Sequence, residues 1–169
     1  MAKHFNIAGE LTQQLLAPGA DISVSKISLT NTQKVSKCKV DLYIEKVTTG
    51  KFYLLKQVEL PIGATLMYDN VKFNNTINEF GLYIKLTDGA TFTLTGSIDP
   101  IADPTVTGVN TLFLSEVSVG DEIVVSSETR TVASIASNTE LEVTAATTNT
   151  ANDTSPDCNP TALVDIILQ

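Results

Sequence analysis

Four aspartates are the residues whose type and spacing most suggest chemistry. Asp99, Asp103, Asp153 and Asp157 lie in two segments rich in proline, threonine and asparagine. Carboxylate oxygens are ligands that calcium prefers, so two such segments that approach each other would hold the ion. Their spacing matches no calcium-binding loop, and aspartates before proline or in turns more commonly accept local backbone hydrogen bonds. We therefore predict no metal site, with calcium at these four residues as the alternative.

Groups that catalyse reactions are scarce. His4 is the only histidine, which excludes a histidine triad and a multi-histidine metal site, and we expect it in a mobile N-terminus. Cys38 and Cys158 are too few for a four-cysteine zinc site. They are predicted to be free thiols in a reducing cytosol, or alternatively one disulfide. No glycine-rich phosphate loop with its lysine is present. We expect no enzymatic activity and no cofactor.

Two tyrosines are candidate interface residues. Tyr43 and Tyr53 fall on the outward phase of neighbouring predicted strands. Outward aromatic side chains on a sheet face mark surfaces that another chain covers, although scattered exposed tyrosines are also ordinary. Cys38 falls on the inward phase of the same alternation, which is typical of a small buried hydrophobe.

The elements that position these residues are predicted to be β-strands. The alternating residues 38–60 indicate an antiparallel hairpin, and 64–73 a further strand. Residues 80–97 give the clearest hairpin signal, with Asp88-Gly89 as the turn, so that Leu82, Ile84 and Leu86 would face Phe92 and Leu94. The phase slips near Ser25-Lys26, which predicts a β-bulge or a bend. The first 16 residues fit either one or two helical turns or an extended arm.

The last apolar run, "ALVDIILQ", alternates and fits a closing strand of the same domain. We therefore predict an all-β fold: an antiparallel β-sandwich of the immunoglobulin-like or jelly-roll-like kind, made of residues 1–100 and 158–169. Residues 101–157, with their linkers, are predicted to be an inserted small β-barrel-like module, because a host domain tolerates a long insertion whose ends lie close together. Its short strands are expected near 111–114, 122–126, 129–135 and 140–144.

Charge and composition exclude several functions. The 169 residues carry a formal charge of −8, which argues against nucleic acid as a partner because affinity for phosphates requires a basic face. Residues 1–85 sum to +3 and residues 86–169 to −11, an asymmetry that can orient a protein on a charged assembly or stack copies head to tail. No apolar run approaches the roughly 20 residues of a membrane span, and no secretory signal is evident. We expect a soluble protein made in the cytoplasm.

The inserted segment resembles a small β module of tailed-bacteriophage virion proteins, in which "TVTGVNTLF" precedes "VSVGDEIVV", "TRTVASI" and "NTELEVT". The host segment resembles phage structural sandwiches, where "ISLTNTQ" precedes "KVDLYIEK", "FYLLKQVELPIGATL" and "LYIKLTDGATFTL". In those sandwiches the last hairpin leads straight to the closing strand, whereas here a module intervenes. The resemblance covers about 40 residues of the module and most of the remainder.

This resemblance implies a virion structural protein, synthesised in the cytoplasm of the infected host. We expect a head decoration protein or a head-to-tail (neck or tail) accessory protein that acts by protein–protein adhesion. Its expected partners are other virion proteins of the capsid, neck or tail, with the chain as a homo-oligomer or in many copies on a symmetric lattice, and neither nucleic acid nor a membrane. The alternative is a carbohydrate-binding or adhesin β-sandwich module of a tail or fibre.

Overall fold

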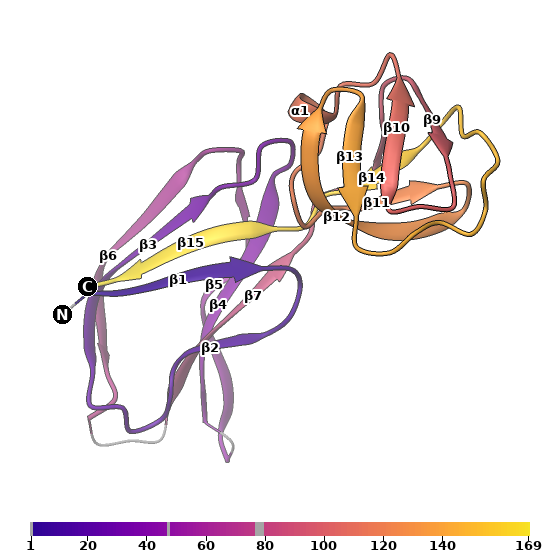
Figure 1. The fold of residues 1–169 in the computed structure, drawn as a ribbon. Helices are drawn as coiled ribbons and strands as arrows, with labels where there is room; N and C mark the ends of the chain where they lie inside the picture. Colours follow the sequence, from indigo (N-terminus) through magenta and orange to yellow (C-terminus); the bar gives the residue numbers. More distant parts are fainter. Residues whose placement is uncertain (1, 47, 77–79) are drawn as a thin grey trace. The chain divides into compact units, whose positions relative to one another are not determined.

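The computed structural model describes residues 2–46, 48–76 and 80–169, and nearly all of their regular structure is β-strand (Figure 1). Within these ranges every strand pairing is antiparallel. One helical turn, α1 (Phe113–Glu116), is the only helix they contain, and none of their helical structure has the length or apolar character to cross a membrane. The predicted all-β antiparallel class is confirmed.

Internal contacts divide the chain into two compact units. The first consists of Met1–Gln33, Lys37–Asp88 and Ala162–Gln169, and the second of Lys34–Ser36 and Gly89–Thr161. The boundaries predicted at 101 and 157 are wrong, because residues 89–100 and 158–161 belong to the second unit. Two short strands there, β8 (Phe92–Thr93) and β9 (Ser97–Pro100), take their hydrogen-bonding partners from that unit.

Four strands form one sheet of the first unit in the order β1, β15, β3 and β6 (Figure 1). Their bounds are β1 (Lys3–Ala8), β15 (Leu163–Leu168), β3 (Ser23–Asn31) and β6 (Thr65–Asn74). The last strand of the chain therefore lies between β1 and β3, where Ile166 is opposite both Phe5 and Leu29. The predicted return of "ALVDIILQ" to the first hundred residues is seen directly in this pairing.

The irregularity predicted in the 22–29 segment is a β-bulge. The register of β3 against β6 shifts between Val24 and Lys26. At this point the N–H groups of Ser25 and Lys26 both donate to the carbonyl of Gln169, at 2.7 and 3.0 Å. The bulge thus fastens the C-terminal residue to β3.

The other sheet of the first unit has the order β2, β7, β4 and β5. Its strands are β2 (Gln13–Leu16), β7 (Gly81–Thr87), β4 (Cys38–Lys46) and β5 (Gly50–Leu60). The pairing of β4 with β5 confirms the hairpin predicted for residues 38–60. The N-terminal segment forms β1 and β2, so it is neither helical nor a free arm. His4 is an exposed residue of β1, opposite Ile167, and the expectation of a mobile N-terminus is wrong because β15 pairs with this segment.

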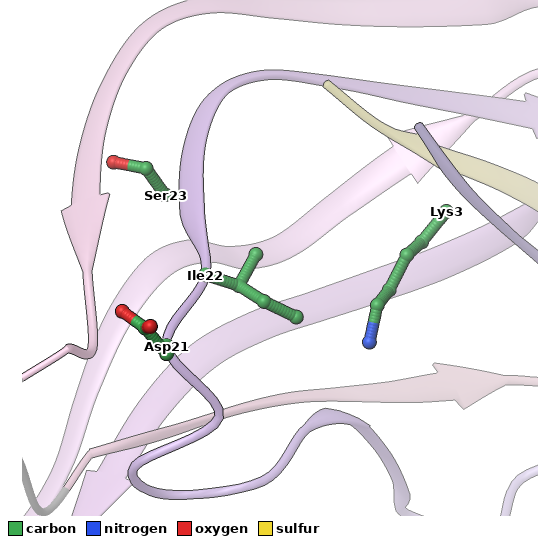
Figure 2. A pocket seen from close by; sticks show the side chains of 4 residues that line it. All are labelled: Lys3, Asp21, Ile22 and Ser23. Atoms are coloured by element: carbon green, nitrogen blue, oxygen red, sulfur yellow. The ribbon is translucent and has the colours of Figure 1, made fainter. Parts of the chain in front are cut away.

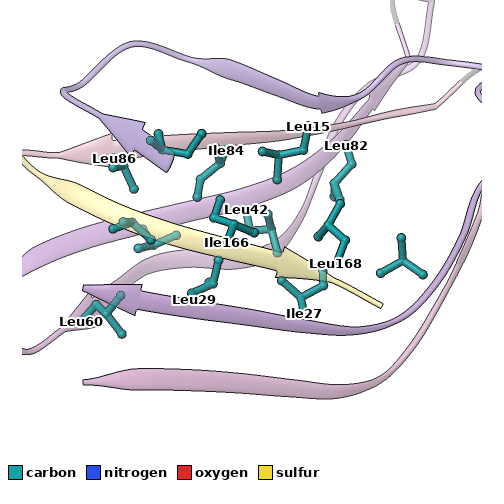
Figure 3. Packing of buried hydrophobic residues seen from close by; sticks show 14 of the residues in the cluster. Leu15, Ile27, Leu29, Leu42, Leu60, Leu82, Ile84, Leu86, Ile166 and Leu168 are labelled. Carbon is teal, nitrogen blue, oxygen red and sulfur yellow. The ribbon is translucent and has the colours of Figure 1, made fainter. Parts of the chain in front are cut away.

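One hydrophobic core lies between the two sheets of the first unit. Figure 3 shows side chains of β3 and β15, such as Leu29 and Ile166, pointing toward those of β4 and β7, such as Leu42 and Ile84. All four are buried. Because each such side chain contributes about 1.5–3 kcal/mol when removed from water, this shared cluster holds the two sheets together.

The hairpin predicted for residues 80–97 does not form. β7 pairs with β2 and β4, whereas β8 pairs with β14 (Asp157–Asn159) of the second unit. Asp88 does not make a hairpin turn; its carboxylate accepts a hydrogen bond of 2.7 Å from the Ala162 N–H. A Cβ on Gly89 would lie 1.7 Å from the Ser36 Oγ, so glycine is needed there for close packing. Alternation specified the strands but not their partners.

Seven strands form the sheet of the second unit in the order β8, β14, β11, β12, β13, β10 and β9. Those not yet given are β10 (Thr105–Val109), β11 (Glu122–Val125), β12 (Glu128–Ser137) and β13 (Glu140–Val143). The order is open, with β8 and β9 at its ends, so the expected barrel-like closure is not observed. Three of the four predicted module strands correspond to β11, β12 and β13. The fourth is wrong: residues 111–114 lead into α1, because Phe113 enters the core of this unit from a helical turn.

Carboxylates fasten the irregular segments of the second unit. Asp121 is fully buried, and it accepts hydrogen bonds from the N–H groups of Ser118 and Thr161 at 2.8 and 3.0 Å. Glu128 accepts bonds from the Thr148 and Asn149 N–H groups at 3.1 and 2.6 Å and also pairs with Arg130. Bonds from the Thr148 side chain and backbone are the main reason that the pKa of Glu128 falls to about 2. The threonine-rich segment that contains Thr148 is therefore held in place by an ionised carboxylate.

Candidate functional site

A row of polar aromatic side chains crosses the outer face of the β2–β7–β4–β5 sheet. Tyr43 on β4 is opposite Tyr53 on β5 and Tyr83 on β7, and Tyr83 is opposite Gln14 on β2. The Tyr43 and Tyr83 rings are stacked with centroids 5.7 Å apart, and the Tyr53 ring is tilted at 5.5 Å from Tyr43. The Gln14 side-chain amide donates to the Tyr83 hydroxyl at 2.8 Å. The row thus spans all four strands.

Alternation explains why these tyrosines face outward. Leu42 and Leu82 are fully buried in the core between the sheets, so the adjacent residues Tyr43 and Tyr83 must lie on the opposite side of their strands. The same alternation in "LYIKL" would have identified Tyr83, which was not among the predicted interface residues. Gly81 also contributes, since a Cβ there would lie 2.7 Å from the Tyr83 ring.

Lysine side chains cover the tyrosine rings. The Lys51 ammonium lies 4.5 Å from the Tyr43 ring centroid and donates to the Tyr43 hydroxyl at 3.3 Å. The Lys56 ammonium lies 4.1 Å from the Tyr53 ring centroid. These are cation–π distances. The hydrogen bond to Tyr43 raises the pKa of Lys51 above its usual value, so the charged form is favoured and the rings carry fixed cations.

Asp41 holds the Lys56 side chain in place on this sheet face. Its carboxylate pairs with the Lys56 ammonium at 2.9 Å and accepts a bond of 2.6 Å from the Gln57 N–H. Burial would raise the pKa of Asp41, but the bonds from Gln57 and Lys56 outweigh burial and lower it. Gln57 has a positive φ of 51° at a register irregularity of β5, and this distortion aims its N–H at Asp41. The bond to Asp41 also raises the pKa of Lys56.

Two further lysines lie on the same face, each opposite a carboxylate that pairs with another lysine. Lys39 is opposite Glu59, which pairs with Lys37. Lys85 is opposite Asp41, which pairs with Lys56. Lys39 lies between the buried residues Cys38 and Val40, and Lys85 lies between Ile84 and Leu86, so both point outward. Both are exposed, and neither makes an ion pair within the described part of the chain. We refer to the outward residues as the tyrosine–lysine face. Its members are Lys39, Asp41, Tyr43, Glu45, Lys51, Tyr53, Lys56, Glu59, Tyr83 and Lys85.

The two predicted interface residues share this face but differ in exposure. Tyr53 is 44% exposed, whereas Tyr43 is only 2% exposed. The outward phase predicted for Tyr43 is right, and its expected exposure is wrong because Tyr53, Tyr83 and Lys51 cover the ring. Tyr43 can therefore act on a partner only by positioning its neighbours.

Two of the four aspartates of the calcium hypothesis, Asp103 and Asp153, bind backbone groups of the second unit. Asp103 accepts a bond from the Thr105 N–H at 2.8 Å, and this bond lowers its pKa. Asp153 accepts bonds from the Ser126 and Ser155 N–H groups. The remaining pair lie on different strands, Asp99 on β9 and Asp157 on β14. Across residues 2–46, 48–76 and 80–169, no three His, Cys, Asp or Glu side chains gather where a metal ion would bind.

Both cysteines are free thiols buried in separate cores. Cys38 belongs to the core of the first unit and Cys158 to that of the second. Burial, followed by the charge of Asp88, raises the pKa of Cys38 to about 11. Burial, followed by the charge of Asp121, raises the pKa of Cys158 to about 12. Neither thiol is suited to act as a nucleophile, because the thiolate is the reactive form.

A hollow of about 470 Å³ in the first unit is lined by Lys3, Asp21, Ile22 and Ser23. Figure 2 shows the Ile22 side chain between the Asp21 carboxylate and the Lys3 ammonium, so the charged groups do not converge on one point. The Ile22 N–H is bonded to the Asn75 side chain. We assign no ligand to this hollow.

Comparison with known proteins adds little to this description. No family model matches the chain, and no curated protein matches it in sequence. Among solved structures, a serine protease of Aeromonas sobria aligns with all of this chain at 9% identity and a TM-score of 0.28. The alignment covers 26% of the protease, so this chain spans about a quarter of its length. This similarity is too low to support any inference about fold or activity.

Proposed function

We propose that this protein is a non-enzymatic structural component of a bacteriophage particle, either a head decoration protein or a head-to-tail (neck or tail) accessory protein. It acts by protein–protein adhesion. The sequence resemblance of both its parts to virion modules supports the setting. The tyrosine–lysine face is the structural observation that supports the adhesive role, because a sheet face with ordered aromatic and cationic side chains suits contact with another protein.

The proposed architecture is an antiparallel β-sandwich into which a small β module is inserted. The two sheets of the first unit share one core, and the last strand of the chain pairs within that unit, which supports the sandwich. The second unit has its own core, which supports the module. In this arrangement the sandwich attaches the protein to the particle, and the particle displays the module at its surface.

Adhesion by this face needs little binding energy from each copy. The tyrosine rings and the two lysines over them are held in place before a partner arrives, so covering this part of the face costs little side-chain entropy. Many copies on a symmetric lattice then add their contacts, and avidity supplies the rest. The expected partners are capsid, neck or tail proteins that present carboxylates to Lys39 and Lys85.

Locating the chain in the source particle tests the proposal. Electron microscopy should show density for this fold at a symmetric position on the head, neck or tail. Purified chain added to particles that lack it should sediment with them, and the double variant Lys39→Glu, Lys85→Glu should bind more weakly. Lys72→Glu is the matched control, because Lys72 is an exposed lysine on the other sheet. Absence of the chain from purified particles would overturn the proposal.

A second candidate is a carbohydrate-binding or adhesin module of a tail or fibre. The tyrosine row favours it, since sugars stack on exposed aromatic rings, and Tyr53 is partly open to solvent. However, Lys56 already occupies one side of that ring. A glycan array with the purified chain separates the two functions: reproducible binding that is lost in Tyr53→Ala would support the module, and silence would remove it.

A further inference from the structure

The formal charge of the protein resides entirely in its second unit. Residues 34–36 and 89–161 contain ten aspartates and glutamates against Lys34 and Arg130, a charge of −8. The first unit contains nine lysines and nine carboxylates, a charge of zero. The second unit therefore offers a net acidic surface to a neighbouring protein, whereas the first unit carries equal numbers of lysines and carboxylates.

Three of the ten acidic residues of the second unit lie on one side of three adjacent strands. Asp99 on β9 is opposite Thr107 on β10, which is in turn opposite Glu140 on β13, and Glu142 lies two residues further along β13. Leu141 between the two glutamates is fully buried in the core, so the glutamates point outward. We call Asp99, Glu140 and Glu142 the acidic face; β9, β10 and β13 contain no lysine or arginine.

No cation in the described part of the chain pairs with the acidic face. Asp99 and Glu140 are exposed, and Glu142 only accepts a hydrogen bond of 2.8 Å from the Thr105 hydroxyl. No salt bridge within the described ranges involves these three carboxylates. Like charges this close repel one another, and a cationic surface from another molecule would relieve the repulsion.

The tyrosine–lysine face presents complementary charges at a matching spacing. Lys85 is opposite Asp41, and Lys39 is opposite Thr87, so the two unpaired lysines are diagonal neighbours on β7 and β4. Diagonal neighbours on a sheet are about 7–8 Å apart. Glu140 and Glu142 alternate on one strand, which places them about 7 Å apart. Two ammonium groups can therefore meet two carboxylates, while the ordered rings keep the rest of the surface in place.

We propose that the tyrosine–lysine face of one copy binds the acidic face of a second copy of this chain. The two surfaces differ, so the contact is head to tail, and repeated contacts form a ring or a linear array. The proposal deepens the adhesive function proposed above and rests on it for its setting in a particle. It identifies a neighbouring copy of the chain in the same particle as one of the partners that present carboxylates to the lysines.

Light scattering and sedimentation of the purified chain test the proposal. We expect a mass above the monomer that rises with protein concentration at about 0.01 M salt, where the Debye length is about 30 Å, and a monomer at about 1 M salt, where it is about 3 Å. The double variants Lys39→Glu, Lys85→Glu and Glu140→Lys, Glu142→Lys should each associate at least about tenfold more weakly, because attraction becomes repulsion. Mixing the two double variants should restore association, since their altered faces are again complementary.

Matched controls separate this contact from a general effect of charge. Lys72→Glu in the first unit and Glu122→Lys in the second alter exposed residues outside both faces, and both variants should associate like the unmodified chain. A monomer at both salt concentrations would overturn the proposal, as would association that survives both double variants. Retention of a monomeric chain on heparin, lost in the lysine double variant, would instead assign the face to a polyanion.

Failure of this proposal can be distinguished from failure of the proposed function. The association experiment uses only the purified chain. A monomeric chain that is found in the particle would overturn the contact between copies but leave the virion role. An associating chain that is absent from particles would overturn the virion role but leave the contact.

Discussion

Replacing Asp121 by alanine should destabilise the second unit more than any change at its surface. The carboxylate is fully buried and accepts the N–H groups of Ser118 and Thr161. Alanine leaves the buried Ser118 N–H and the half-buried Thr161 N–H without these acceptors. An orphaned buried group costs about 1–3 kcal/mol, and the half-buried group costs less because water reaches it. The expected loss is therefore about 2–4 kcal/mol, a large part of the roughly 5–15 kcal/mol that stabilises a typical domain.

Differential scanning calorimetry measures this effect. In a domain of 60–100 residues, about 1 kcal/mol shifts the Tm by about 4–8 °C, so the Tm of the second unit should fall by at least about 8 °C. Asp99→Ala is the control, because Asp99 is an exposed aspartate of the same unit, and surface changes stay within about 0.5 kcal/mol. Asp121→Asn keeps one acceptor oxygen, so its Tm should lie between those of Asp121→Ala and Asp99→Ala.

The Cys158 thiol gives a second readout of the same change. After burial, the charge of Asp121 is the main cause of the pKa of about 12 for this thiol. Asp121→Asn removes the negative charge, so the pKa of Cys158 should fall, as measured by the pH dependence of its alkylation in the native state. Equal Tm values for Asp121→Ala and Asp99→Ala, with an unchanged Cys158 pKa, would refute the assignment of Asp121 as a buried anchor.

Three further changes test other parts of the structure. Ile166→Ala removes a buried side chain between the sheets and should cost about 2–5 kcal/mol in urea unfolding, whereas Ile167→Ala on the outer side of the same strand should cost much less. The pKa of Glu128 is about 2 in the folded protein against a usual value of 4.5. Its contribution to the stability of the fold is therefore complete above pH 4.5 and is lost as the pH falls toward 2. Glu128→Gln should lack this acid-dependent loss of stability, and the backbone amides bound to the carboxylate should exchange hydrogen faster. Gly81→Ala should displace the Tyr83 ring, seen as changed tyrosine NMR shifts, and unchanged shifts would contradict the packing.

Local alternation was sufficient for those elements whose partners are close in sequence or unique. The β4–β5 hairpin, the bulge near Ser25 and the inward position of Cys38 all follow from the phase of short apolar runs. The closing strand could also be predicted, because "ALVDIILQ" alternates but has no neighbouring run with which to pair. In each case only one partner satisfies the hydrophobic phase.

The predictions were wrong where the structure depends on which strands pair or on side chains from neighbouring strands. Asp88-Gly89 carries the chemistry of a hairpin turn, yet the Asp88 carboxylate bonds to Ala162 and Gly89 is needed beside Ser36. Turn propensity cannot distinguish these uses. Burial of Tyr43 depends likewise on residues from β5 and β7, which the phase of its own strand does not reveal.

The order within the tyrosine row bears on how the lysines act. An exposed lysine loses much of its rotamer freedom when it binds a carboxylate. This loss of entropy offsets most of the favourable free energy of a surface ion pair. Lys51 and Lys56 are already restrained by ring and hydrogen-bond contacts, but their charges are partly used by Tyr43 and Asp41. Lys39 and Lys85 are exposed and make no ion pair within the described ranges. A partner therefore meets two kinds of cation: fixed ones that define the shape of the face and free ones that supply most of its electrostatic attraction. Reversal of the charges at Lys39 and Lys85 should consequently change the salt dependence of association. Loss of the Lys51 side chain should weaken association mainly because the tyrosine rings become less ordered.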